Sequence, residues 1–419
     1  MPRWMKRGLL VLVLAVVAAG VGAPFLRADY FRQRIQEALE RGLGRKVEVG
    51  AVHYTLFTGP GFSVSQVIIH DDPRVGIEPL AYVDSLDARV HPASLWSGRL
   101  EFSSLRLSDT TVNLIKPDDG PWNFQRLVER SAEQAGSLPP IYLRSSRVNF
   151  KFGDTKTVVY FRDADLDVVP GDDGRIAITF AGDPGRTDRA QQGYGRITAN
   201  GSWRVANAAS NESQLDLLIE LERSSIPEIA HLLDGQDLGV QGVVSTRARV
   251  AGFVSNLQIS GRLQVEDLRR NEIGARGGNF KVPYKGTLDL RGEKLALETE
   301  SPTPSGNKKG NVDPPPVSWR VAGAGLMTKP HWEASVEMKE LPAASFVEIA
   351  QHLGLTYSLP DAAVKAVIDG KLDGSISYST DAGFRGQVVA QDALMTLPGA
   401  QPIRLRRGEL VVDNQQWRI

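Results

Sequence analysis

Few residues of this 419-residue chain have the types and spacing that chemistry requires. Six histidines are present, at positions 53, 70, 91, 231, 331 and 352, and no two of them have the helical spacing of a metal site. The best cluster of possible metal ligands is His70-Asp71-Asp72, which directly precedes Pro73. Because such a stretch is typical of a turn, we interpret it as a solvated turn rather than as a ligand set. Cysteine is absent, which excludes disulfides, thiolate ligands and cysteine nucleophiles.

Two other chemical readings are also weak. Thr58-Gly59-Pro60-Gly61 has the glycines of a phosphate loop, but it lacks the lysine and precedes a strand pattern instead of a helix. No serine lies in a nucleophile elbow, and carboxylate pairs cannot be separated from ordinary surface charge. The sequence therefore predicts that the protein is not an enzyme and has no cofactor or metal. A β-solenoid enzyme acting on glycans through paired carboxylates is a weaker alternative.

The charge balance also restricts the partners. Lys and Arg total 49 and Asp and Glu total 49, so the formal net charge is zero. A nucleic-acid partner is not expected, since such proteins present a basic surface to the phosphates.

The first residues differ from the rest of the chain. Arg3, Lys6 and Arg7 precede an uncharged run over residues 8–26, which is long enough as a helix to cross a bilayer. We predict a cytoplasmic tail at 1–7, a single transmembrane anchor at 8–26 and the bulk of the chain on the far side. A cleaved signal peptide is the alternative, although Pro24 disfavours cleavage after Ala23. The predicted anchor residues are Leu9, Leu10, Val11, Leu12, Val13, Leu14, Val16 and Val17.

An amphipathic helix is predicted next, over residues 27–45. Phe31, Ile35, Leu39 and Leu43 recur at helical spacing, and glycines follow at positions 42 and 44. This helix could rest on a lipid surface, but we favour the interpretation that it covers the first strands of the following domain.

From Lys46 onwards, apolar residues alternate with polar ones in short runs bounded by Gly, Pro, Asn and Asp. This period predicts a mainly β fold of half-buried antiparallel strands, with a few short helices. Short helices are expected at 125–133, 226–233 and 344–353. A slip of the alternation between Phe102 and Leu105 predicts a β-bulge or a bend. The candidate groove-lining residues are Leu100, Phe102, Leu105, Leu107, Val112 and Leu114.

An internal repeat subdivides the strand region. Trp203-Arg204-Val205-Ala206 recurs as Trp319-Arg320-Val321-Ala322, and Arg291-Gly292-Glu293 recurs as Arg407-Gly408-Glu409 at the same offset. Repeats of this kind predict modular stacking. The predicted segments are an N-terminal β region at 46–135, a first groove repeat at 136–302, a flexible loop at 303–316 and a second repeat, apparently cut short, at 317–419.

Several motifs before residue 125 resemble the AsmA-like family of Gram-negative envelope proteins, including the TamB-like repeating β-groove lipid-transfer proteins. These motifs are Gly44-Arg45-Lys46-Val47, Pro79-Leu80-Ala81-Tyr82-Val83-Asp84, Leu95-Trp96-Ser97-Gly98-Arg99-Leu100, Leu105-Arg106-Leu107, Val112-Asn113-Leu114 and Asp119-Gly120-Pro121-Trp122-Asn123-Phe124. The resemblance implies an elongated antiparallel sheet curled into an open groove, and an inner-membrane-anchored protein whose C-terminal bulk lies in the periplasm. It also implies a role in phospholipid transport toward the outer membrane and in envelope integrity.

The residue pattern is compatible with this function. A sheet with one apolar face must bury that face, and few predicted helices are available to cover it. The sheet must therefore close, stack on itself or leave a groove that acyl chains could fill, since burial contributes about 0.8 kcal/mol per methylene group. We therefore expect phospholipids and the inner membrane as partners, with outer-membrane or periplasmic proteins as further candidates. The alternative function is an envelope scaffold or outer-membrane assembly factor that binds partner proteins by β-strand addition.

Overall fold

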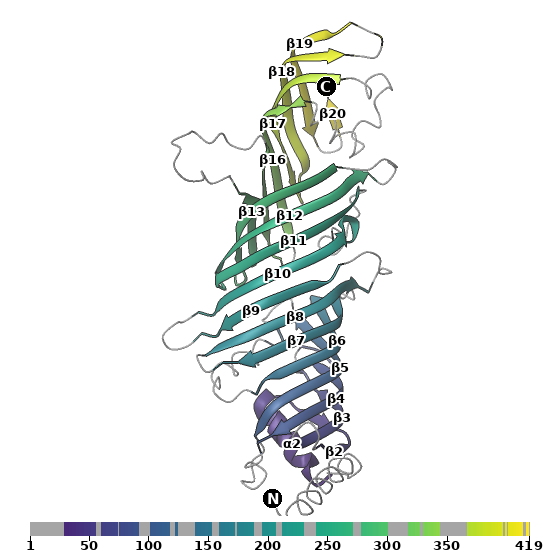
Figure 1. Ribbon diagram of the computed structural model, residues 1–419, viewed down its shortest axis with the longest axis vertical. Helices are drawn as coiled ribbons and strands as arrows, with labels where there is room; N and C mark the ends of the chain where they lie inside the picture. The colour runs from purple at the N-terminus through teal and green to yellow at the C-terminus, as the bar shows by residue number, and fades with distance from the viewer. Residues whose placement is uncertain are drawn as a thin grey trace, which may run out of the picture. The chain divides into compact units, whose positions relative to one another are not determined.

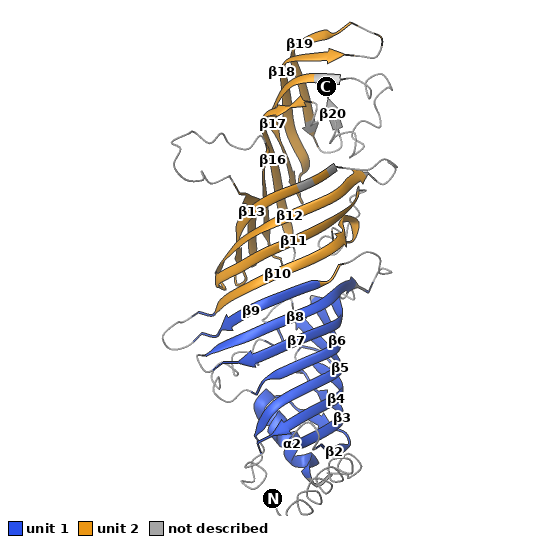
Figure 2. Ribbon diagram, viewed as in Figure 1, with its two compact units in different colours: residues 1–191, 197–213 blue, residues 192–196, 214–419 orange. Residues whose placement is uncertain are grey.

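A computed structural model gives the fold of the chain in two compact units (Figures 1 and 2). Unit 1 comprises residues 1–191 and 197–213, and unit 2 comprises residues 192–196 and 214–419. The described residues are 29–55, 60–73, 75–91, 101–117, 122–124, 139–152, 159–171, 174–187, 195–206, 212–229, 240–270, 278–300, 317–326, 330–343, 367–396, 399, 401–413 and 416–418.

Unit 1 opens with the helix α2, Asp29–Leu43, which confirms the predicted amphipathic helix. The helix ends because Gly44 adopts a left-handed conformation, with a φ of 61°, which favours glycine. The amide of Gly44 donates to the carbonyl of Glu40 at 2.7 Å and closes the last turn. The Glu40 carboxylate accepts a second bond, from the Val47 amide, which joins the helix end to the first strand.

The rest of unit 1 is a sheet in which strands pair mainly with their neighbours in sequence. β1 and β2 share one edge of β3, and β3 to β9 follow in order. No pairing among the described residues joins the β1 and β2 edge to β9, so the sheet is open. The strands are β1 Val47–Val49, β2 Val52–Thr55, β3 Gly61–Ile69, β4 Ala81–Val90, β5 Phe102–Lys116, β6 Ile141–Phe152, β7 Val159–Pro170, β8 Arg175–Arg186 and β9 Ile197–Arg204.

One pair departs from the predicted antiparallel arrangement. β5 and β6 are parallel, with Leu105 opposite Ile141 and Val112 opposite Val148. Parallel neighbours require a crossover connection, since the chain must return to the end at which β5 began. The residues between the two strands, 117–140, provide that connection.

The predicted bulge in β5 is confirmed. Arg89 lies opposite Ser104 whereas Val90 lies opposite Phe102, so Ser103 is the extra residue. Further irregularities cross the sheet, where non-glycine residues with positive φ interrupt the strands. Gln66, Asp109, Ser145 and Asp163 are such residues in β3, β5, β6 and β7. At these points the apolar alternation changes phase, so that Phe62 and Val64 precede Val67 in β3 while all three are buried.

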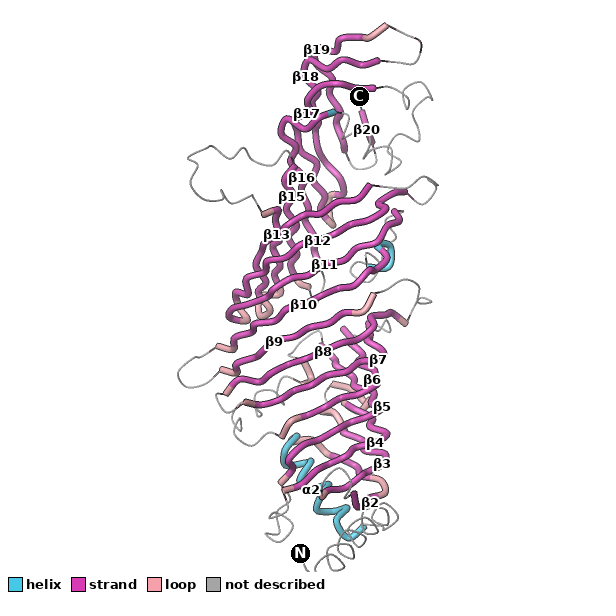
Figure 3. The backbone as a smooth tube through the Cα atoms, viewed as in Figure 1, coloured by secondary structure: helices cyan, strands magenta, loops and turns pink. Residues whose placement is uncertain are grey.

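Unit 2 is an antiparallel meander from β10 to β20, and nearly all of its described backbone is strand (Figure 3). Its strands are β10 Gln214–Ser225, β11 Val240–Phe253, β12 Asn256–Arg270, β13 Gly278–Asp289, β14 Lys294–Thr299, β15 Val317–Ala324, β16 His331–Pro342, β17 Val367–Ser379, β18 Gly383–Thr396, β19 Ile403–Asp413 and β20 Gln416–Arg418. No pairing among its described residues closes this sheet either.

Two sets of four strands in unit 2 share their irregularities. The register shifts between Leu221 and Ser224 where β10 pairs with β11, and between Met338 and Leu341 where β16 pairs with β17. Gly242 and Gly370 have matching positive φ values of 146° and 150°, and Asp267 and Asp392 have values of 54° and 47°. β10–β13 and β16–β19 therefore share the same pattern of register shifts and positive φ values. Of the sequence matches, Arg291-Gly292-Glu293 lies in a turn whereas Arg407-Gly408-Glu409 lies inside β19, so this pair is not structurally equivalent.

Several predictions fall outside the described residues. These are the transmembrane anchor at 8–26 with its tail, the helices at 125–133 and 344–353, the loop at 303–316 and Leu100. In the part of the chain that is described, no helix has the length and apolarity needed to span a membrane. Of the helix expected at 226–233, residues 226–229 are described, and they are helical. The limits of the predicted repeats stay predictions, since the two units are divided at a different place in the chain.

Candidate functional site

The two faces of the sheet in unit 1 differ in chemistry. Residues directly opposite one another in paired strands point to the same face, so a row of partners can be followed across the sheet. The apolar row of unit 1 runs over β3 to β9 as Val64, Leu86, Leu107, Leu143, Leu166, Phe180 and Ala199. The adjacent polar row, on the other face, is Ser63, Asp87, Arg106, Tyr142, Asp167, Thr179 and Asn200. One face is thus continuously apolar from β3 to β9.

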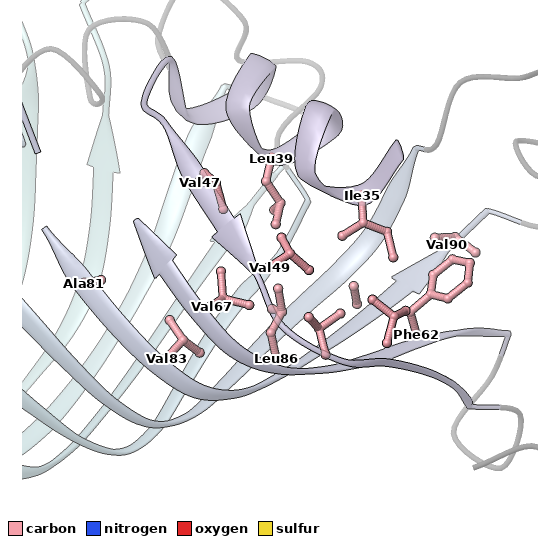
Figure 4. Packing of buried hydrophobic residues seen from close by; sticks show 13 residues of the cluster. Ile35, Leu39, Val47, Val49, Phe62, Val67, Ala81, Val83, Leu86 and Val90 are labelled. Atoms are coloured by element: carbon pink, nitrogen blue, oxygen red, sulfur yellow. The ribbon is translucent and has the colours of Figure 1, made fainter. Parts of the chain in front are cut away.

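Helix α2 covers the apolar face over β1–β4. Ile35 is fully buried and Leu39 is 7% exposed, and both side chains point toward the curved strands below (Figure 4). Burying an aliphatic side chain of this size stabilises the fold by about 1.5–3 kcal/mol. Phe31 adds ring contacts with Tyr54 and Phe62, at centroid distances of 6.0 and 5.1 Å. The strand residues beneath the helix are Val47, Val49, Val52, Phe62, Val64, Val67, Ala81, Val83, Leu86, Ala88 and Val90, all buried.

The predicted lining residues lie on this same face. Phe102, Leu105, Leu107 and Val112 are opposite the buried Val90, Ala88, Leu86 and Ala81. All four are half-buried and pack against the cluster beneath α2. Leu114 is opposite Phe150 and is also half-buried, although it lies outside that cluster. The structure therefore brings five of the six predicted residues together on one strand, β5, and Leu100 lies outside the described residues.

A row of aromatic rings extends the face beyond β5. Trp122, Phe150, Phe161 and Phe180 make successive ring contacts at centroid distances of 6.1, 5.8 and 5.1 Å. The three contacts are close to perpendicular, the edge-to-face arrangement that aromatic pairs favour. All four rings are half-buried. Sequence reasoning missed this aromatic row, because its members come from different strands and only their pairing register aligns them.

A buried polar network joins the motifs before residue 125. Arg45 donates to the backbone carbonyl of Asn123 at 2.9 Å and forms an ion pair with Asp71 at 3.4 Å. Asn123 donates to Asp71 at 2.5 Å and to the carbonyl of Asn113 at 2.9 Å. Its side-chain oxygen accepts the amide of Ile115. Since the Asp71 side chain is 1% exposed, the interpretation of 70–72 as a solvated turn is wrong, and this carboxylate instead holds the helix end to the sheet.

Unit 2 has the same two-faced construction. Its apolar row crosses β10 to β18 as Leu217, Val250, Ile259, Gly286, Leu297, Val321, Ala334, Tyr378 and Phe384. Two buried clusters lie on this face, one including Leu257 and Tyr284 and the other Leu372 and Val388. Phe384, however, remains 50% exposed. Large apolar side chains on a sheet face without a protein cover are typical of a binding surface.

The other face of unit 2 carries cross-strand ion pairs. Its polar row is Arg249, Ser260, Lys285, Glu298, Arg320, Ser335, Ser377, Arg385 and Asp413. Glu298 lies between Lys285 and Arg320, at 3.5 and 3.4 Å. Asp216 hydrogen bonds to Arg249 and raises the pKa of its guanidinium. The hydrogen bond from Gln264 and then the one from Arg223 lower the pKa of Glu266.

Other kinds of site find little support. Among the described residues, no group of three His, Asp or Glu could hold a metal ion. One depression, about 470 Å³, is shallow and lies over β12–β16 in unit 2, lined by small and mixed side chains such as Thr287, Ala322 and Glu333. The geometry therefore supports a surface that binds apolar material along the apolar rows.

The comparison with known families adds to this geometry. Residues 5–178 match the model of the AsmA family. Over these residues the chain resembles the AsmA family. The match covers α2, β1–β7 and the start of β8. It includes the Arg45–Asp71–Asn123 network. No curated protein and no solved structure matches the chain.

Proposed function

We propose that this protein binds lipid acyl chains along the apolar face of its open sheet and takes part in phospholipid transport toward the outer membrane. The observation that carries the proposal is the apolar row in each unit, seven residues over β3–β9 in unit 1 and nine over β10–β18 in unit 2. Each row lies directly beside a row of polar residues. A sheet with one apolar and one polar face over this many strands needs an apolar partner on its apolar face only.

An acyl chain is a suitable partner for physical reasons. It is flexible and has no polar atoms along its length, so it can lie across strands whose side chains differ in size. Burial contributes about 0.8 kcal/mol per methylene group without any directional contact. An apolar surface without specific contacts also allows the acyl chain to slide along it, which transport requires.

The location of this activity is part of the same proposal. We place the apolar run at 8–26 in the inner membrane as a single anchor and the sheet in the periplasm. The basic residues before this run and the match of residues 5–178 to the AsmA family support this placement.

Photo-crosslinking tests the proposal with a matched pair of neighbouring positions. A photoreactive residue at Leu107 replaces a member of the apolar row, and the same residue at Arg106 replaces a member of the polar row. We expect phospholipid to be captured from Leu107 and not from Arg106, as detected by mass spectrometry of the purified full chain. Absence of lipid at Leu107, or equal capture at both positions, would contradict the proposal.

The alternative, a scaffold that binds partner proteins by strand addition, predicts a different product. Crosslinks would then connect the chain to one protein in stoichiometric amounts, and no phospholipid would be purified with it.

A further inference from the structure

The apolar face of unit 1 is covered unequally along its length. Over β3 and β4, the members of the apolar row are almost inaccessible, with Val64 fully buried and Leu86 3% exposed. One strand further on, Leu107 lies directly opposite Leu86 and is half-buried. Leu166 and Phe180 are half-buried as well, whereas Leu143, between Leu107 and Leu166 in the row, is 6% exposed. The change coincides with the limit of α2, whose side chains lie over β1–β4 (Figure 4).

Helix α2 is held firmly at both ends. At its C-terminal end, Glu40 accepts the Val47 amide, and the next residues lead to Arg45 in the buried network with Asp71 and Asn123. Toward its N-terminal end, the Phe31 ring lies between Tyr54 and Phe62, which also contact each other at 5.6 Å. These contacts belong to a packed core, so α2 is fixed to the sheet and is not a loosely packed helix.

We infer that α2 is a permanent plug, which occupies the apolar face over β1–β4 in place of an acyl chain, so that the lipid-binding surface begins at β5. The inference rests on the proposed function and assigns the first binding subsite within it. Acyl chains reach this subsite from the open side of the sheet, because the helix blocks passage along the face from β4.

The aromatic row supplies the surface of that first subsite. Trp122, Phe150, Phe161 and Phe180 follow one another across β6–β8 and the segment after β5, all half-buried. Val112 and Leu114 continue the same face on β5, since they lie opposite Val148 and Phe150. Aromatic rings provide a large apolar area with few rotatable bonds, which favours binding of a flexible chain. The ligand class is the acyl chain of a phospholipid.

The test compares two residues that face each other across β4 and β5. A photoreactive diazirine analogue with the shape of leucine is placed at Leu86 or at Leu107 in the full-length chain, in vesicles of phosphatidylethanolamine and phosphatidylglycerol. We expect capture of phospholipid from Leu107 and only the background of a non-illuminated sample from Leu86. Equal capture at the two positions would overturn the plug. Absence of capture at Leu86, Leu107 and a third position, Phe384, would instead contradict the proposed function itself.

A second variant shows whether α2 is the cause. Replacing Ile35 and Leu39 by alanine in the Leu86 probe chain truncates the two buried α2 side chains of the cluster that contains Leu86. We expect phospholipid capture at Leu86 to rise above background while far-UV circular dichroism retains the strand signal. If Leu86 remains at background in this folded variant, a segment other than α2 excludes the lipid and the inference is wrong.

Discussion

At the scale of single residues, the most consequential group is Arg45. Its guanidinium bridges Asp71, Asp72 and the Asn123 carbonyl, so one side chain connects the end of α2 to the turn after β3 and to the segment after β5. Arg45 and Asn123 are 78 positions apart, and Asn123 and Asp71 are 52 apart. Sequence reasoning recognised each motif separately and could not predict the network, because its members meet only after the strands have paired.

Replacement of Arg45 by alanine should destabilise unit 1. The change leaves the Asp71 carboxylate buried without its cation, and breaking a buried ion pair in this way costs about 3–5 kcal/mol. Thermal unfolding followed by circular dichroism measures the loss. As a control, Lys371→Ala removes an exposed ion pair with Glu340, for which the expected cost is small because solvent screens the pair. Equal effects of the two substitutions would contradict the role of Arg45.

The titration of the Glu48 carboxylate reports on its hydrogen bond with His70. The hydrogen bond from His70, at 2.9 Å, is the main cause that lowers the pKa of Glu48 below its ordinary 4.5. A lowered folded-state pKa means that the stabilisation is present above pH 4.5 and is lost as the pH falls through the lower value. We expect His70→Ala to raise the pKa of Glu48 toward 4.5, as followed by carbon-detected NMR of labelled glutamate. An unchanged titration of Glu48 would show that another group lowers its pKa.

At the scale of elements, the period of the apolar residues predicted helices and bulges, which are local features. It did not predict how strands pair, which depends on distant parts of the chain. The spacing of Phe31, Ile35 and Leu39 correctly predicted α2, and the phase slip after Phe102 correctly predicted the bulge at Ser103. The parallel pairing of β5 with β6 was not predicted, since alternation is the same for parallel and antiparallel neighbours. The direction depends on how the chain connects the two strands, which the alternation within each strand does not reveal.

The end of α2 permits a matched pair of glycine substitutions. Gly44→Ala forces a side chain into a left-handed conformation and should cost about 1 kcal/mol. Gly42→Ala places a methyl group inside the helix, where it meets nothing within 4 Å, and should stabilise the chain by about 0.5–1 kcal/mol. Urea unfolding of the two variants should therefore move in opposite directions. A shift of both in the same direction would contradict the assignment of Gly44 as the residue that ends the helix.

At the scale of the whole molecule, both units are built as open sheets with one apolar and one polar face. The candidate site could be predicted from the sequence on β5, where Leu105, Leu107 and Val112 lie on the predicted face. Its extension over other strands could not, because the register between strands decides which residues share a row. Leu107 continues to Phe180, and Leu217 to Phe384, only through the pairings that the fold establishes.

Phe384 tests whether unit 2 contributes to lipid binding. It belongs to the apolar row and is half exposed, so Phe384→Asp should lower the amount of phospholipid purified with the chain while changing stability little. Arg385→Asp alters the adjacent residue of the polar row and should leave bound lipid unchanged. Quantitative lipid mass spectrometry of both variants measures the difference. Equal lipid content in the Phe384 variant and the parent would remove unit 2 from the binding surface.

The pairing of each strand with its neighbour in sequence also bears on how the chain folds. Sheets whose contacts are close in sequence lose little entropy in closing loops and form quickly for their size. From β6 to β9 in unit 1 and throughout unit 2, each strand can therefore join an existing edge in the order in which it is synthesised. We expect the slow step at β6, which has to cross over to lie parallel to β5 before the next strand has an edge to join.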